Sequence, residues 1–337
     1  MTARGTEVPR REQSGHEARF TRPWRVGRGR EPMGVLATTA QRTRLSRGAS
    51  LEPRAVGYAY IAPALSILSA FLLVPLGYAI YVSFFNWSGA GPLTFAGLSN
   101  YIEIVKNPQL LSAFYHSAIL ILFFAVLPIA LALLLVALMT RVAIRGLTVY
   151  RTVLFLPQVI PLVAVAVVWE WVLGENGPVN SILRDVGASS LAQAWLGSFT
   201  WALPAIGIIG TWIGYGFAMV IFMAGVEKIP QSLYDAARVD GAGPVREFFA
   251  VTLPGLRNEL LVVAVITVTS ALTTFDIVYI ITLGGPGTST IVPAYSAFTL
   301  AFTDFQIGAA AAMGVVLGVI VFLVAIGILA LDRRSRR

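Results

Sequence analysis

The sequence predicts an all-α membrane protein with six transmembrane helices, and three observations carry this prediction. Of the 337 residues, 56% are hydrophobic and only 12% are charged, which is about half the charge of a typical soluble domain. The apolar residues form unbroken blocks of more than twenty residues, the length that a helix needs to cross a bilayer. Blocks of this kind differ from the shorter, alternating strands of a membrane β-barrel. Helices satisfy their own backbone groups in lipid, where no water can do so.

Six apolar runs are long enough to span the membrane. They are residues 60–84, 118–139, 153–173, 203–226, 260–281 and 307–331. Six spans place both chain ends on one side, and the segments on that side hold 23 of the 25 Lys and Arg residues. Only Lys106 and Arg184 lie on the other side. Because Lys and Arg are enriched in cytoplasmic loops, we expect both termini to lie in the cytoplasm.

The first 55 residues differ in composition from the rest of the chain. They are rich in Arg, Gly and Pro, low in hydrophobicity and without periodicity, which is typical of a disordered segment. We expect residues 1–55 to form a disordered basic cytoplasmic tail and residues 56–337 to form the membrane domain. The net charge of +8 then reflects the basic residues gathered on one side of a membrane. We therefore predict a lipid environment and no nucleic-acid partner.

The residue content argues against catalysis, metal binding and nucleotide binding. The chain has no Cys and two His, too few for a metal site built from these ligands. Asp235, Asp240 and Glu247 lack a further carboxylate at helical spacing, since Gly243 and Pro244 occupy that stretch. No G-x-x-x-x-G-K-[ST] phosphate loop occurs. We therefore predict no metal, no cofactor and no enzymatic activity, and we expect any ATP to be hydrolysed by a separate subunit.

The loop between the fourth and fifth spans, residues 227–259, has the local signals of two short helices. Gly241 can adopt the left-handed conformation that ends a first helix. Pro244 suits the first turn of a second helix over residues 245–252, which we expect Pro254 to break. The sequence therefore predicts a helix-turn-helix on the cytoplasmic side.

This loop resembles the EAA motif of permease subunits in the ATP-binding-cassette (ABC) importer family, with Asp235 standing where Glu is usual. The matching residues are Asp235-Ala236-Ala237, Asp240-Gly241-Ala242, Phe248 and Leu253-Pro254. The resemblance implies that the loop docks into a groove on a cytoplasmic ATPase subunit, with the first acidic residue facing a basic partner. The residues expected to couple to the ATPase are Asp235, Ala236, Ala237, Asp240, Gly241, Ala242 and Phe248.

Further stretches resemble the carbohydrate branch of this family, which includes maltose, lactose and glycerol-3-phosphate permeases. They include Phe95-Ala96-Gly97-Leu98, Leu154-Phe155-Leu156-Pro157 and Gly284-Gly285-Pro286-Gly287. The resemblance implies the type I ABC importer permease fold in a bacterial plasma membrane. It also implies three kinds of partner: a second permease subunit, a pair of ATPase subunits and an extracytoplasmic substrate-binding protein.

A sugar crossing between helices needs hydrogen-bonding groups and space at membrane depth. Thr267, Ser270 and Thr274 follow helical spacing and are predicted to share one face of the fifth span. The other predicted pathway residues are Gln158, Gly210, Gly214 and Phe217, at positions that line the translocation site in related permeases. The alternative is that the hydroxyl groups only bond to their own helix backbone or hold neighbouring helices together.

Two alternatives concern the substrate and the function. A glycerol-3-phosphate permease would need basic residues for the phosphate, and no Arg or Lys lies deep in any predicted span, which favours a neutral sugar. A membrane transferase acting on lipid-linked sugars would need clustered acidic residues or His at one membrane face, which the sequence does not show. Asp276 is the one acidic residue well inside a predicted span, and we expect it to pair with the second permease subunit; the alternative is a proton relay.

Overall fold

The computed structural model describes residues 54–139 and 146–335. The chain divides into two units, Met1–Tyr60 and Ile61–Arg337, and only the beginning of one helix is described in the first unit. The predicted tail, residues 1–55, lies outside the described residues except for its last two, with which that helix begins. The division into a tail and a membrane domain stays a prediction.

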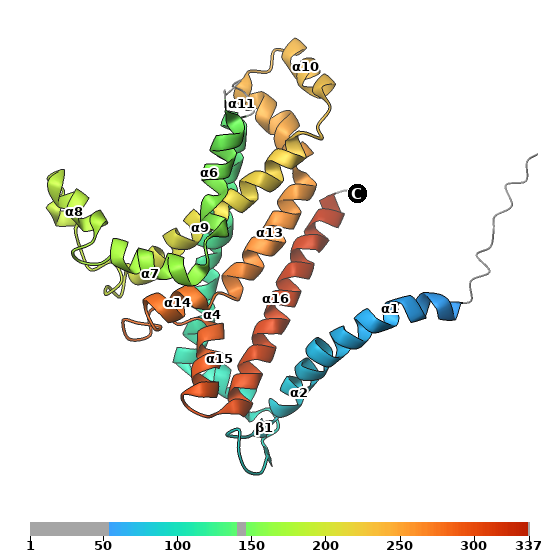
Figure 1. Cartoon of the computed structure of the whole chain (residues 1–337), viewed down its shortest axis with the longest axis vertical. Coiled ribbons are helices and arrows are strands. Elements are labelled where there is room, and N and C mark those ends of the chain that lie inside the picture. The colour runs from blue at the N-terminus through green and yellow to red at the C-terminus, as the bar shows by residue number, and fades with distance from the viewer. Residues whose placement is uncertain (1–53, 140–145, 336–337) are drawn as a thin grey trace, which may run out of the picture. The chain divides into compact units, whose positions relative to one another are not determined.

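Helices make up nearly all of the regular structure, as the predicted fold class requires (Figure 1). The first are α1 (Arg54–Leu68), α2 (Val74–Val82), α3 (Ser99–Lys106), α4 (Pro108–Ile121), α5 (Leu127–Met139), α6 (Leu147–Val159), α7 (Leu162–Val172) and α8 (Pro178–Asp185). The others are α9 (Ala202–Val226), α10 (Gln231–Val239), α11 (Pro244–Glu247), α12 (Leu253–Gly255), α13 (Arg257–Leu272), α14 (Asp276–Ile281), α15 (Pro293–Phe302) and α16 (Ile307–Ser335). Wider π-helical turns lie at Ser69–Leu73, Leu122–Val126 and Phe248–Thr252, and a 3₁₀ turn lies at Ser189–Leu191. Strands β1 (Phe85–Asn86) and β2 (Thr94–Phe95) form a short antiparallel hairpin.

Within the described residues, five helical segments are long and apolar enough to cross a membrane. They are Tyr58–Val82, Pro108–Met139, Ala202–Val226, Arg257–Ile281 and Ile307–Leu331. The bent pair α6 and α7 makes a sixth span if the two helices are counted together. The second span begins ten residues before the predicted start, because Pro108 and the Asn107 side chain, which accepts from the Gln109 N–H, begin a helix there.

The third predicted span, residues 153–173, is not one straight helix. It is divided between α6 and α7, which are bent by 93° at the break. Ile160 leaves the helical conformation with ψ 132°, because the proline that follows it disfavours the α region. Pro161 is extended as well, also with ψ 132°. The prediction of a continuous helix was wrong. The segment is apolar throughout, but Pro161 interrupts the helix.

The fifth predicted span, residues 260–281, contains a short break. Helix α13 ends at Leu272 and α14 begins at Asp276. Thr274 lies between them, where its hydroxyl donates to the carbonyl of Ser270 at 3.1 Å and satisfies an acceptor at the helix end. The spacing predicted that Thr274 shares one continuous helix face with Thr267 and Ser270. The break places Thr274 just beyond the end of that helix instead.

Helix α9 lies at the centre of the packed helices, with α5 and α6 along its sides. Its side chains Ile206, Ile209 and Phe222 have no exposed surface. A Cβ on Gly216 would lie 2.6 Å from the carbonyl oxygen of Leu154 in α6, so this glycine permits the close approach of the two helices. The polar cavity described below opens beside α9.

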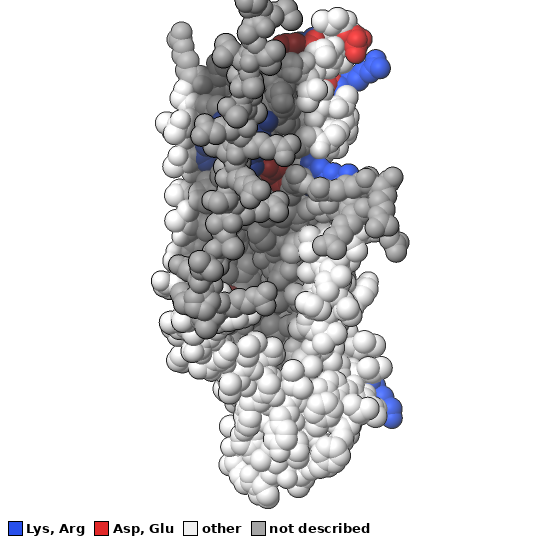
Figure 2. All heavy atoms as spheres, turned by 90° about the vertical axis from the view of Figure 1, so that its right-hand side faces the viewer, with Lys and Arg blue, Asp and Glu red and all other residues white. Residues whose placement is uncertain are grey.

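Charged and uncharged surfaces are separated along the helices. Figure 1 shows α10 and α11 at one end and the β1–β2 hairpin at the other. In Figure 2, charged side chains gather mainly at the end that carries α10 and α11, and most of the described surface below it is uncharged. An uncharged middle is what a lipid-facing surface requires, because charges are costly in the bilayer.

Candidate functional site

A cavity of about 330 Å³ lies beside α9, lined by residues of α6, α7, α9, α13 and α14, of the break between α13 and α14, and of the π-helical turn Leu122–Val126. All seven predicted pathway residues line it: Gln158, Gly210, Gly214, Phe217, Thr267, Ser270 and Thr274. The remaining lining residues are Phe124, Leu162, Ile213, Ile266, Thr273, Phe275, Asp276 and Ile277. We call this site the polar cavity. Its volume is at the low end of the range of small-molecule pockets, roughly 300–1,000 Å³. The structure brings the predicted residues together, and their role in transport stays a prediction.

The hydroxyl groups in the polar cavity bond to the backbone behind them. Thr267 donates to the carbonyl of Val263 at 2.8 Å, and Ser270 donates to that of Ile266 at 3.0 Å. Thr274 makes the equivalent bond one turn further on, to the carbonyl of Ser270. Each of these hydroxyls therefore donates its proton to the backbone of its own chain segment, as the alternative expected. Their oxygen atoms still carry lone pairs that can accept a hydrogen bond.

The two predicted glycines have different surroundings. A Cβ on Gly210 would lie 2.1 Å from the ring of Phe124, so this glycine provides space for an aromatic ring from the π-helical turn. A Cβ on Gly214 would lie 3.4 Å from the nearest atom, Cγ of Pro128, which is close to ordinary contact. Gly210 shapes the cavity by admitting the ring, and Gly214 borders it directly.

Three of the eight lining residues that were not predicted add an aromatic ring, a hydroxyl and a charge to the polar cavity. Phe124 reaches it from a π-helical turn, which no local feature of the sequence predicts. Thr273 follows the helical part of α13, next to Thr274, and the break after Leu272 turns both toward the cavity. Asp276 begins α14 and also lines the cavity. Its acidic character inside an apolar run was the signal that could have assigned it.

The turn in loop 227–259 has the geometry that the sequence predicts. Gly241 has φ +74°, the left-handed conformation expected after a helix end. Its N–H donates to the carbonyl of Arg238 at 3.0 Å, and the N–H of Ala242 donates to that of Ala237 at 2.9 Å. This pair of bonds is a Schellman motif, which satisfies the last carbonyls of α10.

The second helix of the loop is longer than predicted. Pro244 begins α11, but the helix continues through a π-helical turn and α12 to Gly255 instead of ending at Thr252. The predicted break at Pro254 was wrong. In the π-helical turn the N–H of Leu253 donates to the carbonyl five residues earlier, and Pro254 falls in the first turn of α12, where a missing N–H is tolerated.

The predicted coupling residues gather around this turn. Asp235, Ala236, Asp240 and Gly241 are exposed, whereas Ala237, Ala242 and Phe248 are half-buried. The carboxylate of Asp235 lies 3.5 Å from Nη1 of Arg238, and Nε of Arg238 donates to Glu247 at 3.2 Å. Arg238 therefore links the two helices of the loop. The basic partner that Asp235 contacts in this chain is Arg238 itself, a residue that the sequence reasoning did not assign.

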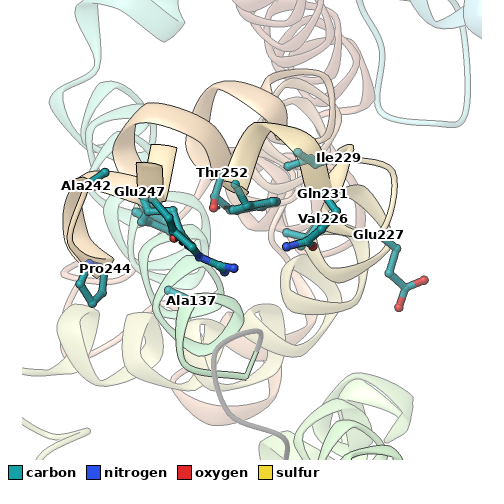
Figure 3. Close-up of a pocket in the computed structure, with 12 residues that line it drawn as sticks. Ala137, Val226, Glu227, Ile229, Gln231, Ala242, Pro244, Glu247 and Thr252 are labelled. Atoms are coloured by element: carbon teal, nitrogen blue, oxygen red, sulfur yellow. Dashed lines mark hydrogen bonds and ion pairs between the residues drawn. The ribbon is translucent and has the colours of Figure 1, made fainter. Parts of the chain in front are cut away.

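A second cavity, of about 670 Å³, lies behind the loop (Figure 3). Ala137 of α5, Val226 at the end of α9 and the loop residues Ala242 and Glu247 are among the residues that line it. Figure 3 shows the side chain of Glu227 pointing away from the others; its carboxylate lies 3.4 Å from Nη1 of Arg151 in α6. The loop and the ends of α5 and α9 therefore line the same cavity.

The described side chains give no metal-binding cluster. Within residues 54–139 and 146–335, no group of three or more His, Asp or Glu side chains could hold a metal ion. The polar cavity offers groups that can hydrogen-bond a small polar ligand, and the exposed loop offers a surface on which a protein can dock.

Comparisons with known proteins agree on one family. A family model described as "Binding-protein-dependent transport system inner membrane component" matches residues 145–337. The "Probable ABC transporter permease protein YurN" of Bacillus subtilis (strain 168) is 32% identical over 272 residues, or 80% of this chain and 93% of that protein. The "Diacetylchitobiose uptake system permease protein NgcF" of Streptomyces coelicolor is 32% identical over 279 residues, or 79% of each chain.

A solved structure shows the same fold. The crystal structure of a bacterial ABC transporter that imports the acidic polysaccharide alginate contains a chain with a TM-score of 0.71 and 23% identity, covering 84% of this chain and 96% of that one. The predicted type I ABC importer permease fold is thereby confirmed. The chain belongs to the family of binding-protein-dependent transport system inner membrane components, and it is a multi-pass permease of the ABC transporter type.

Proposed function

We propose that this permease carries a sugar across the membrane, through a pathway that includes the polar cavity. The observation that supports this most directly is the composition of the cavity wall, where four hydroxyl groups and one amide lie beside aromatic rings. Hydroxyl and amide groups can bond to a polyhydroxylated ligand, and aromatic rings can cover its apolar faces. The named substrate of a relative, diacetylchitobiose, belongs to the same chemical class.

Uptake of radiolabelled compounds tests this proposal. A strain from which the permease has been deleted, with and without the restored chain, is given a panel of lactose, maltose, diacetylchitobiose and glycerol 3-phosphate. We expect at least one neutral sugar to require the restored chain and glycerol 3-phosphate to be taken up equally in both strains. Dependence on the chain for glycerol 3-phosphate alone would favour the phosphorylated alternative instead.

The proposal includes three partners. An extracytoplasmic binding protein delivers the sugar, a second permease subunit completes the pathway, and a pair of ATPase subunits docks on loop 227–259. The exposed coupling residues around Gly241 support the last of these contacts. ATP is then hydrolysed by the separate ATPase subunits. Their conformational change is transmitted to the membrane helices through the loop, which moves as a rigid lever.

We further propose that both termini lie in the cytoplasm, on the strength of the asymmetry of 23 against two in Lys and Arg. A reporter enzyme that is active only outside the cytoplasm is fused after Arg337. We expect no reporter activity, and we expect activity when the same reporter is inserted after Ser88, in the loop between β1 and β2. Activity of the C-terminal fusion would overturn the orientation.

The different function considered above, transfer of a lipid-linked sugar, finds no support in the relatives, which are named as transport proteins. Where such an enzyme uses a metal ion, it would require acidic or His side chains placed to hold it, and the described part of the chain offers no group of three that could do so.

A further inference from the structure

The side chains of the polar cavity offer mainly hydrogen-bond acceptors. In addition to Thr267, Ser270 and Thr274, the hydroxyl of Thr273 donates to a backbone carbonyl, that of Thr269 at 2.9 Å. A hydroxyl has one proton, so all four hydroxyls in the wall face a ligand as acceptors. Among the lining side chains, only Gln158 carries N–H donors. A ligand that bonds well here must therefore donate hydrogen bonds.

Asp276 adds a carboxylate to the same wall. Its side chain lines the polar cavity and is exposed. Within the described part of the chain, no Lys or Arg nitrogen lies within 4.0 Å of its carboxylate, and none of the residues that line the cavity is basic. A carboxylate only accepts hydrogen bonds, and it repels other anions across a cavity wall of low dielectric constant.

We infer that Asp276 does not pair with the second permease subunit, as its charge alone had suggested, but is a specificity-determining residue that restricts the polar cavity to ligands without negative charge. Neutral sugars present many hydroxyl donors to the acceptors of the wall. Sugar phosphates, sulfonates and uronates bring an anionic group that finds neither a cation nor several donors. This inference rests on the proposed function for the identity of the ligand as a sugar, whereas the exclusion of anions depends only on the chemistry of the wall.

The absence of Cys from the sequence permits a direct test of the charge in the cavity. Ser270, which is exposed in the cavity and differs from Cys by one atom, is replaced by Cys in the assembled transporter. The complex is treated in detergent with one of two methanethiosulfonates, one carrying a trimethylammonium group and the other a sulfonate. Modification of this chain is followed by mass spectrometry. The sulfonate reagent is itself a small anion, so its rate measures how well anions enter.

The rate of the cationic reagent divided by that of the anionic reagent is the quantity of interest. Ser88→Cys, at an exposed position outside the cavity, gives the reference ratio. We expect the ratio at Ser270→Cys to exceed the reference on the order of tenfold, as a nearby carboxylate at intermediate dielectric constant would produce. Adding Asp276→Asn should bring the ratio to within about twofold of the reference.

Two further variants make the test specific. Asp276→Glu keeps the charge and should keep the high ratio. Asp304→Asn removes an exposed carboxylate that does not line the cavity and should also keep it. A ratio at Ser270→Cys equal to the reference in the assembled transporter would overturn the inference, and it would indicate that a cation of the second permease subunit neutralises Asp276. Because labelling requires no transport, this result is independent of whether the sugar panel supports the proposed function.

Discussion

In loop 227–259 the geometry of the turn is set by two hydrogen bonds within the six residues from Ala237 to Ala242. The polar cavity, in contrast, is lined by residues that range along the chain from Phe124 to Ile277. The positive φ of Gly241 could therefore be predicted from its neighbours alone. The wall of the cavity depended on a π-helical turn, two helix breaks and the packing of five helices. A local motif can therefore be located in the sequence residue by residue, whereas a cavity can be located only when the spans are assembled.

The largest expected effect is that of Gly241→Val in the loop. A β-branched residue at φ +74° costs about 1–3 kcal/mol of strain and misdirects both short helices. No other atom lies within 4 Å of a Cβ built there, so the cause is the backbone alone. We expect the ATPase subunit to be lost when the complex is purified through a tag on the permease, with normal amounts of the permease itself.

Two controls accompany this variant. Gly243→Ala places a side chain at φ −69° two residues away, where no strain is expected, and should retain the ATPase. Asp235→Glu, which restores the residue usual in the family, should retain it too. Recovery of wild-type amounts of the ATPase with Gly241→Val would mean that this loop is not the coupling element.

The next effect is expected in the cavity, when Thr267, Ser270 and Thr274 are replaced together by Val. Valine matches threonine in volume and is one methyl group larger than serine, and it removes the three acceptor oxygens, each worth about 0.5–1.5 kcal/mol in a hydrogen bond. We expect the rate of sugar uptake at low concentration to fall by about tenfold or more, with the ATPase still bound. The matched control is Thr269→Val, on α13 but outside the lining of the cavity. Unchanged uptake by the triple variant would assign this face to helix packing.

A smaller effect is expected from Gly210→Ala, which tests how the cavity wall is packed. Its Cβ would overlap the ring of Phe124, and overpacking of this kind typically costs about 1–3 kcal/mol. We expect a lower midpoint of thermal unfolding for the purified permease complex. Gly214→Ala, where the nearest atom is 3.4 Å away, should change the midpoint less. Equal midpoints for the two variants would show that the ring can move aside.

The smallest effect is expected for Arg238→Gln. It removes the contacts of Arg238 with Asp235 and Glu247, but the arginine side chain is 57% exposed, and ion pairs of exposed groups contribute about 0–1 kcal/mol. We expect ATPase association to weaken at most severalfold, as measured by co-purification over a range of salt concentrations. Loss as complete as that of Gly241→Val would mean that Arg238 contacts the ATPase directly.

Two predictions that involve prolines were wrong for physical reasons that the structure shows. The continuous third span was wrong because Pro161 forces the preceding residue out of the helical conformation. The break at Pro254 was wrong in the opposite sense, because a π-helical turn placed this proline in a tolerated position. A proline can break or begin a helix, and its effect depends on hydrogen bonds that the sequence does not show.

The fold class, the positions of most spans and the Gly241 turn could all be predicted from the sequence alone. Each depends on hydrophobicity or on backbone preferences within a few residues, which the local sequence carries. The tertiary structure alone decided that Gln158, the α9 glycines and the α13 hydroxyls share one cavity. It also decided that Asp276 faces the same cavity. The reason is that contacts between helices depend on their rotation, bending and packing, and these are properties of the assembled protein that no single segment specifies.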